Sequence, residues 1–111
     1  VQRCKIMGLT ANQRLCKQPA ETLKFQMDFA NVLGGNENII SISSIDSEKV
    51  GGYTSDLVIG STGLVSATPT GTVEMYIENG TLGSTYRIEV LVNTDASQII
   101  EGDGILYVTD Q

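Results

Sequence analysis

The chain has 111 residues, a formal net charge of −6 and an apolar fraction of 41%. A chain of this length forms one domain around a single hydrophobic core. No apolar run approaches the ~20 residues of a membrane-spanning helix, and the acidic charge repels phosphate backbones. We therefore expect neither a membrane nor a nucleic acid as partner.

Residues 1–18 form a basic opening segment, and no apolar core of a secretion signal lies within it. Four of the seven Lys and Arg residues of the chain are in this segment: Arg3, Lys5, Arg14 and Lys17. This asymmetry predicts an arm that contacts an acidic neighbouring surface. A solvated terminus or an extra edge strand explains the segment equally well.

Cys4 and Cys16 are the only cysteines of the chain. They either close one short loop as a disulfide or remain two reduced, partly buried thiols, and we favour the reduced thiols of a protein assembled in cytoplasm. A zinc site needs about four ligands, and the chain has no His. We expect no zinc site.

Alternating apolar and polar residues predict two strands in the first half of the chain. In 23–29 the apolar set is Leu23, Phe25, Met27 and Phe29, which is typical of a half-buried strand. A turn rich in Gly and Asn follows, and IISISSI at 39–45 predicts a second strand with one buried side. Glycines and Pro69 interrupt 46–72, where we expect one or two short strands with wide loops.

The clearest alternation lies between residues 73 and 92. Its apolar positions are Val73, Met75, Ile77, Tyr86, Ile88, Val90 and Val92. The loop between the two halves contains Gly80 and Gly83, so the pattern predicts two antiparallel strands joined in a hairpin. A last strand that carries Ile105, Leu106, Tyr107 and Val108 is expected, and Gly102 and Gly104 inside it predict a bulge or a close backbone approach.

Six or seven strands and no long amphipathic helix predict an all-β fold. An immunoglobulin-like antiparallel β-sandwich is the simplest closed arrangement, with 1–18 as an N-terminal arm or extra edge strand and 19–111 as the sandwich. The Cys-Trp-Cys pattern of true immunoglobulin domains is missing, because the chain has no Trp.

A search for chemistry finds no convincing site. Without His, catalysis would depend on carboxylates, Lys, Tyr or a thiol, and none of these is arranged as an acid–base pair. Glu101 and Asp103, with Asp95 nearby, could offer oxygen ligands to Ca²⁺, but we favour a solvated acidic turn. We expect no catalytic residue, no metal and no cofactor, and therefore no enzyme.

Two residues break the alternation in a way that favours protein contact. Tyr76 lies opposite the inward set of its strand, and tyrosine is enriched at interface cores. Leu91 occupies an outward position where a polar residue is expected, so it marks a second packed face or a partner contact. Alternation instead places Tyr86 and Tyr107 in the core.

Four landmarks follow one another between Lys17 and Asp110. They are KQPAETLKFQMDFANVL, the Ile and Ser strand NIISISSI, TVEMYIENGTLGSTYRIEVLVNTDAS and the closing ILYV. In this order they resemble the fiber-tail adaptor family of tailed bacteriophages. The chain departs from the family in having no Trp, with Phe29 where a Trp is common, and NGTLGST in place of a GGT-type turn.

The resemblance implies an immunoglobulin-like sandwich in a phage virion, assembled in the host cytoplasm and without enzymatic activity. Such a protein joins tail or fiber components, with other virion proteins as partners, as a homo-oligomer or in many copies. A capsid decoration protein that stabilises the head is the alternative, and a carbohydrate-binding sandwich is a more distant one.

Overall fold

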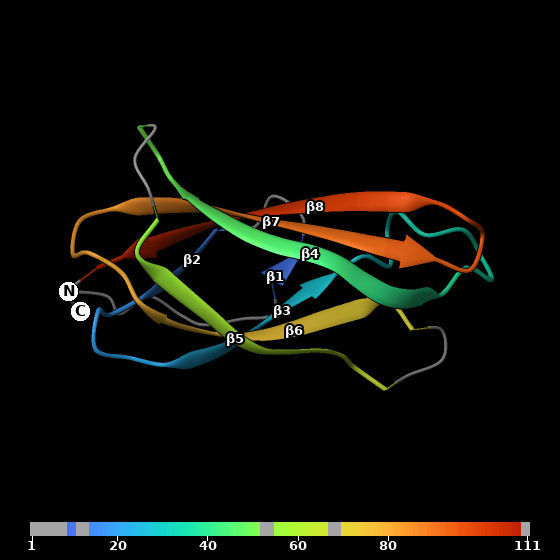
Figure 1. Cartoon of the computed structure of the whole chain (residues 1–111), viewed down its shortest axis with the longest axis horizontal. Helices are drawn as coiled ribbons and strands as arrows, with labels where there is room; N and C mark the ends of the chain where they lie inside the picture. The colour runs from blue at the N-terminus through green and yellow to red at the C-terminus, as the bar shows by residue number, and fades with distance from the viewer. Residues whose placement is uncertain (1–8, 11–13, 52–54, 67–69, 110–111) are drawn as a thin grey trace.

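The computed structural model of the chain describes residues 9–10, 14–51, 55–66 and 70–109. Eight strands lie in these ranges (Figure 1): β1 (Leu9–Thr10), β2 (Arg14–Lys17), β3 (Leu23–Asp28), β4 (Ile39–Lys49), β5 (Leu57–Leu64), β6 (Thr72–Asn79), β7 (Thr85–Thr94) and β8 (Ile99–Val108). Among the same residues there is no helix long and apolar enough to cross a membrane.

The strands form two four-stranded sheets that pack face to face (Figure 1). The first sheet has the order β1-β3-β6-β5 and the second has the order β2-β8-β7-β4. The two short strands β1 and β2 pair in parallel with β3 and β8, and all other pairs are antiparallel. The prediction of an all-β sandwich is confirmed.

The core lies between the two sheets and is built by alternation. From β6 it receives Val73, Met75 and Ile77, and from β7 it receives Tyr86, Ile88, Val90 and Val92. Phe25, Met27 and Phe29 come from β3 and the residue after it, and all ten side chains are almost fully buried. The inward set predicted for these strands is therefore correct.

The predicted hairpin between the two central strands is wrong. β6 pairs with β3 and β5 in the first sheet, whereas β7 pairs with β4 and β8 in the second. The turn between Asn79 and Thr85 crosses from one sheet to the other, so the buried faces of β6 and β7 oppose each other. Alternation identifies the buried face of a strand but does not identify its hydrogen-bonded neighbour.

Strand β8 begins at Ile99 and contains Gly102, Gly104 and the four residues 105–108, as predicted. Leu106 and Val108 point into the core, and Tyr107 between them points outward and is half-buried. The core position predicted for Tyr107 is therefore wrong by one step of the alternation.

At Gly102 strand β8 approaches the opposite sheet closely. A Cβ atom added there would lie 2.6 Å from Met27 Sδ and 2.7 Å from a carbon of the Phe29 ring. The β7–β8 register runs without a shift through this residue. Of the two alternatives predicted for the glycines of this strand, a close approach is confirmed at Gly102 and a bulge is not.

Tyr86 anchors the turn that crosses between the sheets. Its ring is fully buried, as predicted, and its hydroxyl accepts a 2.8 Å hydrogen bond from the Thr81 N–H and donates to the Asp56 carboxylate. Hydrogen bonds from the Thr81 and Tyr86 hydroxyls hold the pKa of Asp56 below its ordinary value. One side chain thereby joins the 79–85 turn to the residue before β5.

Cys16 is buried in β2 and forms a disulfide. This corrects the expectation of reduced thiols. The other cysteine of the chain, Cys4, lies outside the described residues. Alternation could not decide between the two states, because a reduced cysteine also behaves as a small, often buried apolar residue.

We predict that Gly102→Ala destabilises the fold by about 1–3 kcal/mol, because the new methyl group must displace Met27 or Phe29 in a packed core. Urea unfolding followed by circular dichroism measures this change. Gly63→Ala in β5 is the matched control, since a Cβ at Gly63 would have no heavy atom within 4 Å. Equal stability of the two variants would contradict the close approach.

Candidate binding surfaces

Tyr76 lies at the centre of the outer face of the first sheet. It pairs with Lys24 of β3 on one side and with Gly60 of β5 on the other. Its side chain is 41% exposed, and Val58, two residues before Gly60, is 43% exposed. Because Gly60 has no side chain, the β5 residue directly opposite Tyr76 leaves the ring uncovered, and Tyr76 points outward as the alternation predicts.

A hollow of about 220 Å³ lies beside this ring. It is lined by Thr22, Gly60, Ser61, Tyr76 and Glu78. The Thr22 hydroxyl donates a 3.3 Å hydrogen bond to the Glu78 carboxylate, so the hollow has one aromatic wall and one acidic wall. Sequence reasoning identified Tyr76 but missed the hollow, because the hollow requires the Gly60–Tyr76 register.

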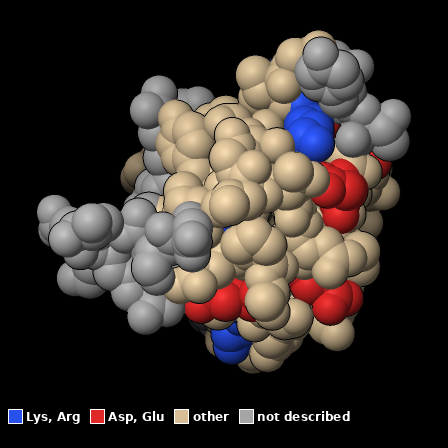
Figure 2. Space-filling view, turned by 90° about the vertical axis from the view of Figure 1, so that its left-hand side faces the viewer, with Lys and Arg blue, Asp and Glu red and all other residues tan. Residues whose placement is uncertain are grey.

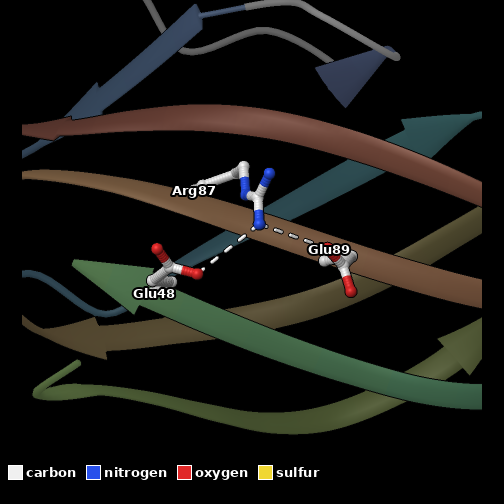
Figure 3. A network of polar contacts seen from close by, with 3 residues as sticks. All are labelled: Glu48, Arg87 and Glu89. Atoms are coloured by element: carbon white, nitrogen blue, oxygen red, sulfur yellow. Dashed lines mark hydrogen bonds and ion pairs between the residues drawn. The ribbon is translucent and has the colours of Figure 1, made fainter. Parts of the chain in front are cut away.

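The outer face of the second sheet carries a row of acidic residues. Asp46 of β4, Glu89 of β7 and Asp103 of β8 are direct neighbours across the three strands. Arg87 lies within 3.5 Å of both Glu48 and Glu89 and partly neutralises the row (Figure 3). Like charges directly opposite one another in a sheet are destabilising, so this face has an excess of repulsion.

Glu101 adds to this repulsion. A hydrogen bond to Asp103 and the negative charge of Asp103 raise the pKa of Glu101 above its ordinary value. Oxygen atoms of Glu89, Glu101 and Asp103 lie within 4.8 Å of one another. The prediction that Glu101 and Asp103 lie in a solvated acidic turn is wrong, because both residues are on the surface of strand β8.

Asp95 is not part of this group. Its carboxylate accepts hydrogen bonds from the backbone and side-chain N–H groups of Asn38.

Leu91 belongs to the same face of the second sheet. It lies between Ser44 of β4 and Glu101 of β8 and is only partly exposed. Among the described residues, Leu91 is less exposed than apolar side chains such as Val58 and Ile40. Its neighbours are polar, so it offers a small apolar area inside a charged surface.

The basic residues of the opening segment have different positions. Lys17 is only 2% exposed, and its ammonium group donates to the carbonyl oxygens of Gln18 at 2.7 Å and Asn79 at 2.6 Å. Burial lowers the pKa of Lys17, while Glu21 and Glu78 oppose this shift. Arg14 is opposite Ile105 in the β2–β8 pair, and Arg3 and Lys5 lie outside the described residues.

Both ends of the sandwich also expose features that sequence reasoning missed. At the end that holds the β6–β7 turn, Val50 and Leu82 are largely exposed, and uncharged residues cover most of the described surface (Figure 2). At the opposite end a hollow of about 370 Å³ is lined by Asp28, Ala30, Leu33, Gly34, Gly35, Gly71 and Thr72. Five of these seven residues lie in loops, and Asp28 and Thr72 are at the ends of β3 and β6.

A comparison with family models decides the relationship of the chain to known proteins. Residues 17–107 match the family described as podophage GP4 fiber-tail adaptor protein gp77. The chain belongs to this family. The resemblance predicted from the sequence is confirmed, and membership in the adaptor family supports a structural role in a phage tail and a place in the virion.

The other comparisons add little to the adaptor assignment. No curated protein matches the chain. The solution structure of amebosin is similar over 95% of this chain and 99% of its own length, at 13% identity and a TM-score of 0.42. A likeness at this level supports no argument about function or fold.

We predict that Glu101→Gln raises the midpoint of urea unfolding at pH 7, because the amide keeps a hydrogen bond to Asp103 and removes the repulsion. The pKa of Glu101 is raised in the folded state, so folding favours the protonated carboxyl group. The negative charge of Glu101 therefore destabilises the wild-type protein at pH 7, and this destabilisation disappears as the pH falls and the group is protonated. The gain over wild type therefore shrinks at pH 4.

Glu48→Gln is the control on the same face. Glu48 pairs with Arg87, so its neutralisation relieves no repulsion and brings no gain at pH 7. A loss of stability in Glu101→Gln, or an equal gain in both variants, would contradict the claim that repulsion within the acidic row destabilises the fold.

Proposed function

We propose that the chain is a non-enzymatic structural protein that joins tail or fiber components of a tailed phage through protein–protein contacts. The family match over residues 17–107 is the observation that carries this proposal. The family description names a connection between fiber and tail, and a protein with this role needs two binding surfaces on one rigid body. The sandwich offers two independent outer faces and two ends.

We also propose that the sandwich is immunoglobulin-like. If β3 to β8 are taken as strands B, C, D, E, F and G, the sheet orders contain B-E-D and G-F-C, which is the constant-type arrangement. Tyr86 supports the assignment. It stands near the start of the F-like strand β7 and bonds back to the Thr81 N–H, as the tyrosine corner of such domains does.

The division into an arm at 1–18 and a sandwich at 19–111 remains part of the proposal. Within 1–18, β1 and β2 each add a strand to one of the sheets. The contact with an acidic neighbour is proposed for Arg3, Lys5 and Arg14, whereas Lys17 is better explained as an internal support for the Asn79 carbonyl. Tyr76 is the strongest contact candidate among the described residues.

Assembly in the host cytoplasm, many copies or a homo-oligomer, and the lack of nucleic-acid or membrane partners complete the proposal. The acidic charge of the chain supports the exclusion of nucleic acid. Many copies suit a symmetric particle, because weak contacts then add through avidity.

We predict that the protein is found in purified virions and stays with the tail fraction when tails are separated from heads. Quantitative mass spectrometry of both fractions measures this, and a major capsid protein serves as the marker of head contamination. Recovery with the heads would favour the capsid decoration alternative. Absence from intact particles would contradict a virion role altogether.

A further inference from the structure

We infer that strand β5 is a docking edge, and that it pairs with an extended segment of a neighbouring virion protein that places a Lys or Arg side chain beside Tyr76. This inference rests on the proposed function and names the surface and the chemistry of one partner. It is carried by three observations: an edge strand without charged residues, an open hollow next to it, and an acidic wall on that hollow.

Strand β5 lies at an edge of the first sheet. β5 is the last strand of its sheet, and in the part of the chain that the structure describes only β6 pairs with it. Its sequence, LVIGSTGL, contains no charged residue. Natural sheets protect their edges with charges, prolines or bulges, and an apolar edge without charges pairs readily with another strand.

Strand β4, one of the two edge strands of the second sheet, shows the contrast. β4 carries Asp46, Glu48 and Lys49 and has two register shifts. Those are the devices that prevent edge pairing. β5 has one register shift, between Gly60 and Gly63, which leaves Leu57–Gly60 as a regular stretch whose outer backbone groups a partner strand can bind.

The hollow lies next to this regular stretch. A Cβ atom at Gly60 would have no heavy atom within 4 Å, so space is open between the edge and the Tyr76 ring. A side chain from an added strand, at the position next to Gly60, can cross over the glycine and enter the hollow of about 220 Å³. Exposed Val58 provides an apolar contact for the same strand.

The charge of the hollow selects the side chain. Glu78 forms its acidic wall, whereas Glu74 on the other side of Tyr76 is 3.8 Å from Lys24. The nearby Lys17 ammonium is held by the Asn79 carbonyl. A Lys or Arg side chain can lay its carbon stem on the tyrosine ring and direct its cation to Glu78. An acidic side chain would be repelled there.

The test uses particles assembled without the native protein and supplied with variants of the full chain. We expect Gly60→Leu, which fills the hollow, to lower the number of copies per particle about tenfold or more, as the loss of a central anchor does. Glu78→Lys, which reverses the charge of the acidic wall, should have a similar effect. The matched controls are Gly63→Leu and Glu48→Lys, which leave the hollow unchanged.

Circular dichroism and unfolding midpoints show whether each variant is folded. Folded Gly60→Leu at wild-type copy number would overturn the docking edge and leave the proposed function intact. Absence of the wild-type protein from particles would instead contradict the proposed function. These two failures are therefore distinguishable.

A photocrosslinking amino acid gives a second measurement that does not depend on filling the hollow. We expect the group at Val58 to crosslink, in assembled particles, to a peptide that contains Lys or Arg within an alternating apolar stretch. The same group at Ile40, an exposed apolar position on the edge strand β4, is the control. Crosslinks from Ile40 alone, or to a segment without a basic residue, would overturn the inference.

Discussion

The fold depends on the opposition of β6 and β7 across the core. Each is a central strand of its own sheet, and their inward side chains meet between the sheets. Because β6 has neighbours on both edges, β3 and β5 are positioned by it, and β7 positions β4 and β8 in the same way. The turn anchored by Tyr86 connects the two strands, so that turn fixes how the two sheets are related.

This arrangement explains how much of the fold the sequence could predict. Period-two alternation correctly identified the inward residues of β3, β6 and β7, because each apolar side chain must be removed from water whichever strand lies beside it. It gave the wrong partner for β6, since the choice between a hairpin and a sheet crossing depends on the geometry of the 79–85 turn. The prediction that Tyr107 faces the core was wrong for a related reason. Gly102 and Gly104 have no side chains, so the sequence does not reveal which side of β8 faces inward.

The candidate surfaces were less predictable than the core. Alternation directs Tyr76 and Glu89 outward, but register alone reveals that Glu89 lies between Asp46 and Asp103, and that Tyr76 lies beside Gly60. Lys17 shows the limit of charge patterning, because a basic residue in a basic segment is buried and bonded to backbone carbonyls. Membership of the family was predictable, because it depends on the order of strands and turns along the chain.

Gly60 connects the stability of the sheet with the proposed contact. A glycine inside a strand weakens it and leaves its neighbours without a packing partner, and a cross-strand side chain beside an aromatic ring is normally stabilising. A Cβ atom at position 60 would have no heavy atom within 4 Å, so a side chain there has room to begin covering Tyr76. The present sequence leaves the ring exposed, which forgoes a stabilising contact, and leaves the edge without charge, which keeps it open to pairing with another strand. A sequence departs from local stability in this way where a site is used for function, and a partner strand that covers the ring and pairs with β5 would restore both missing interactions together.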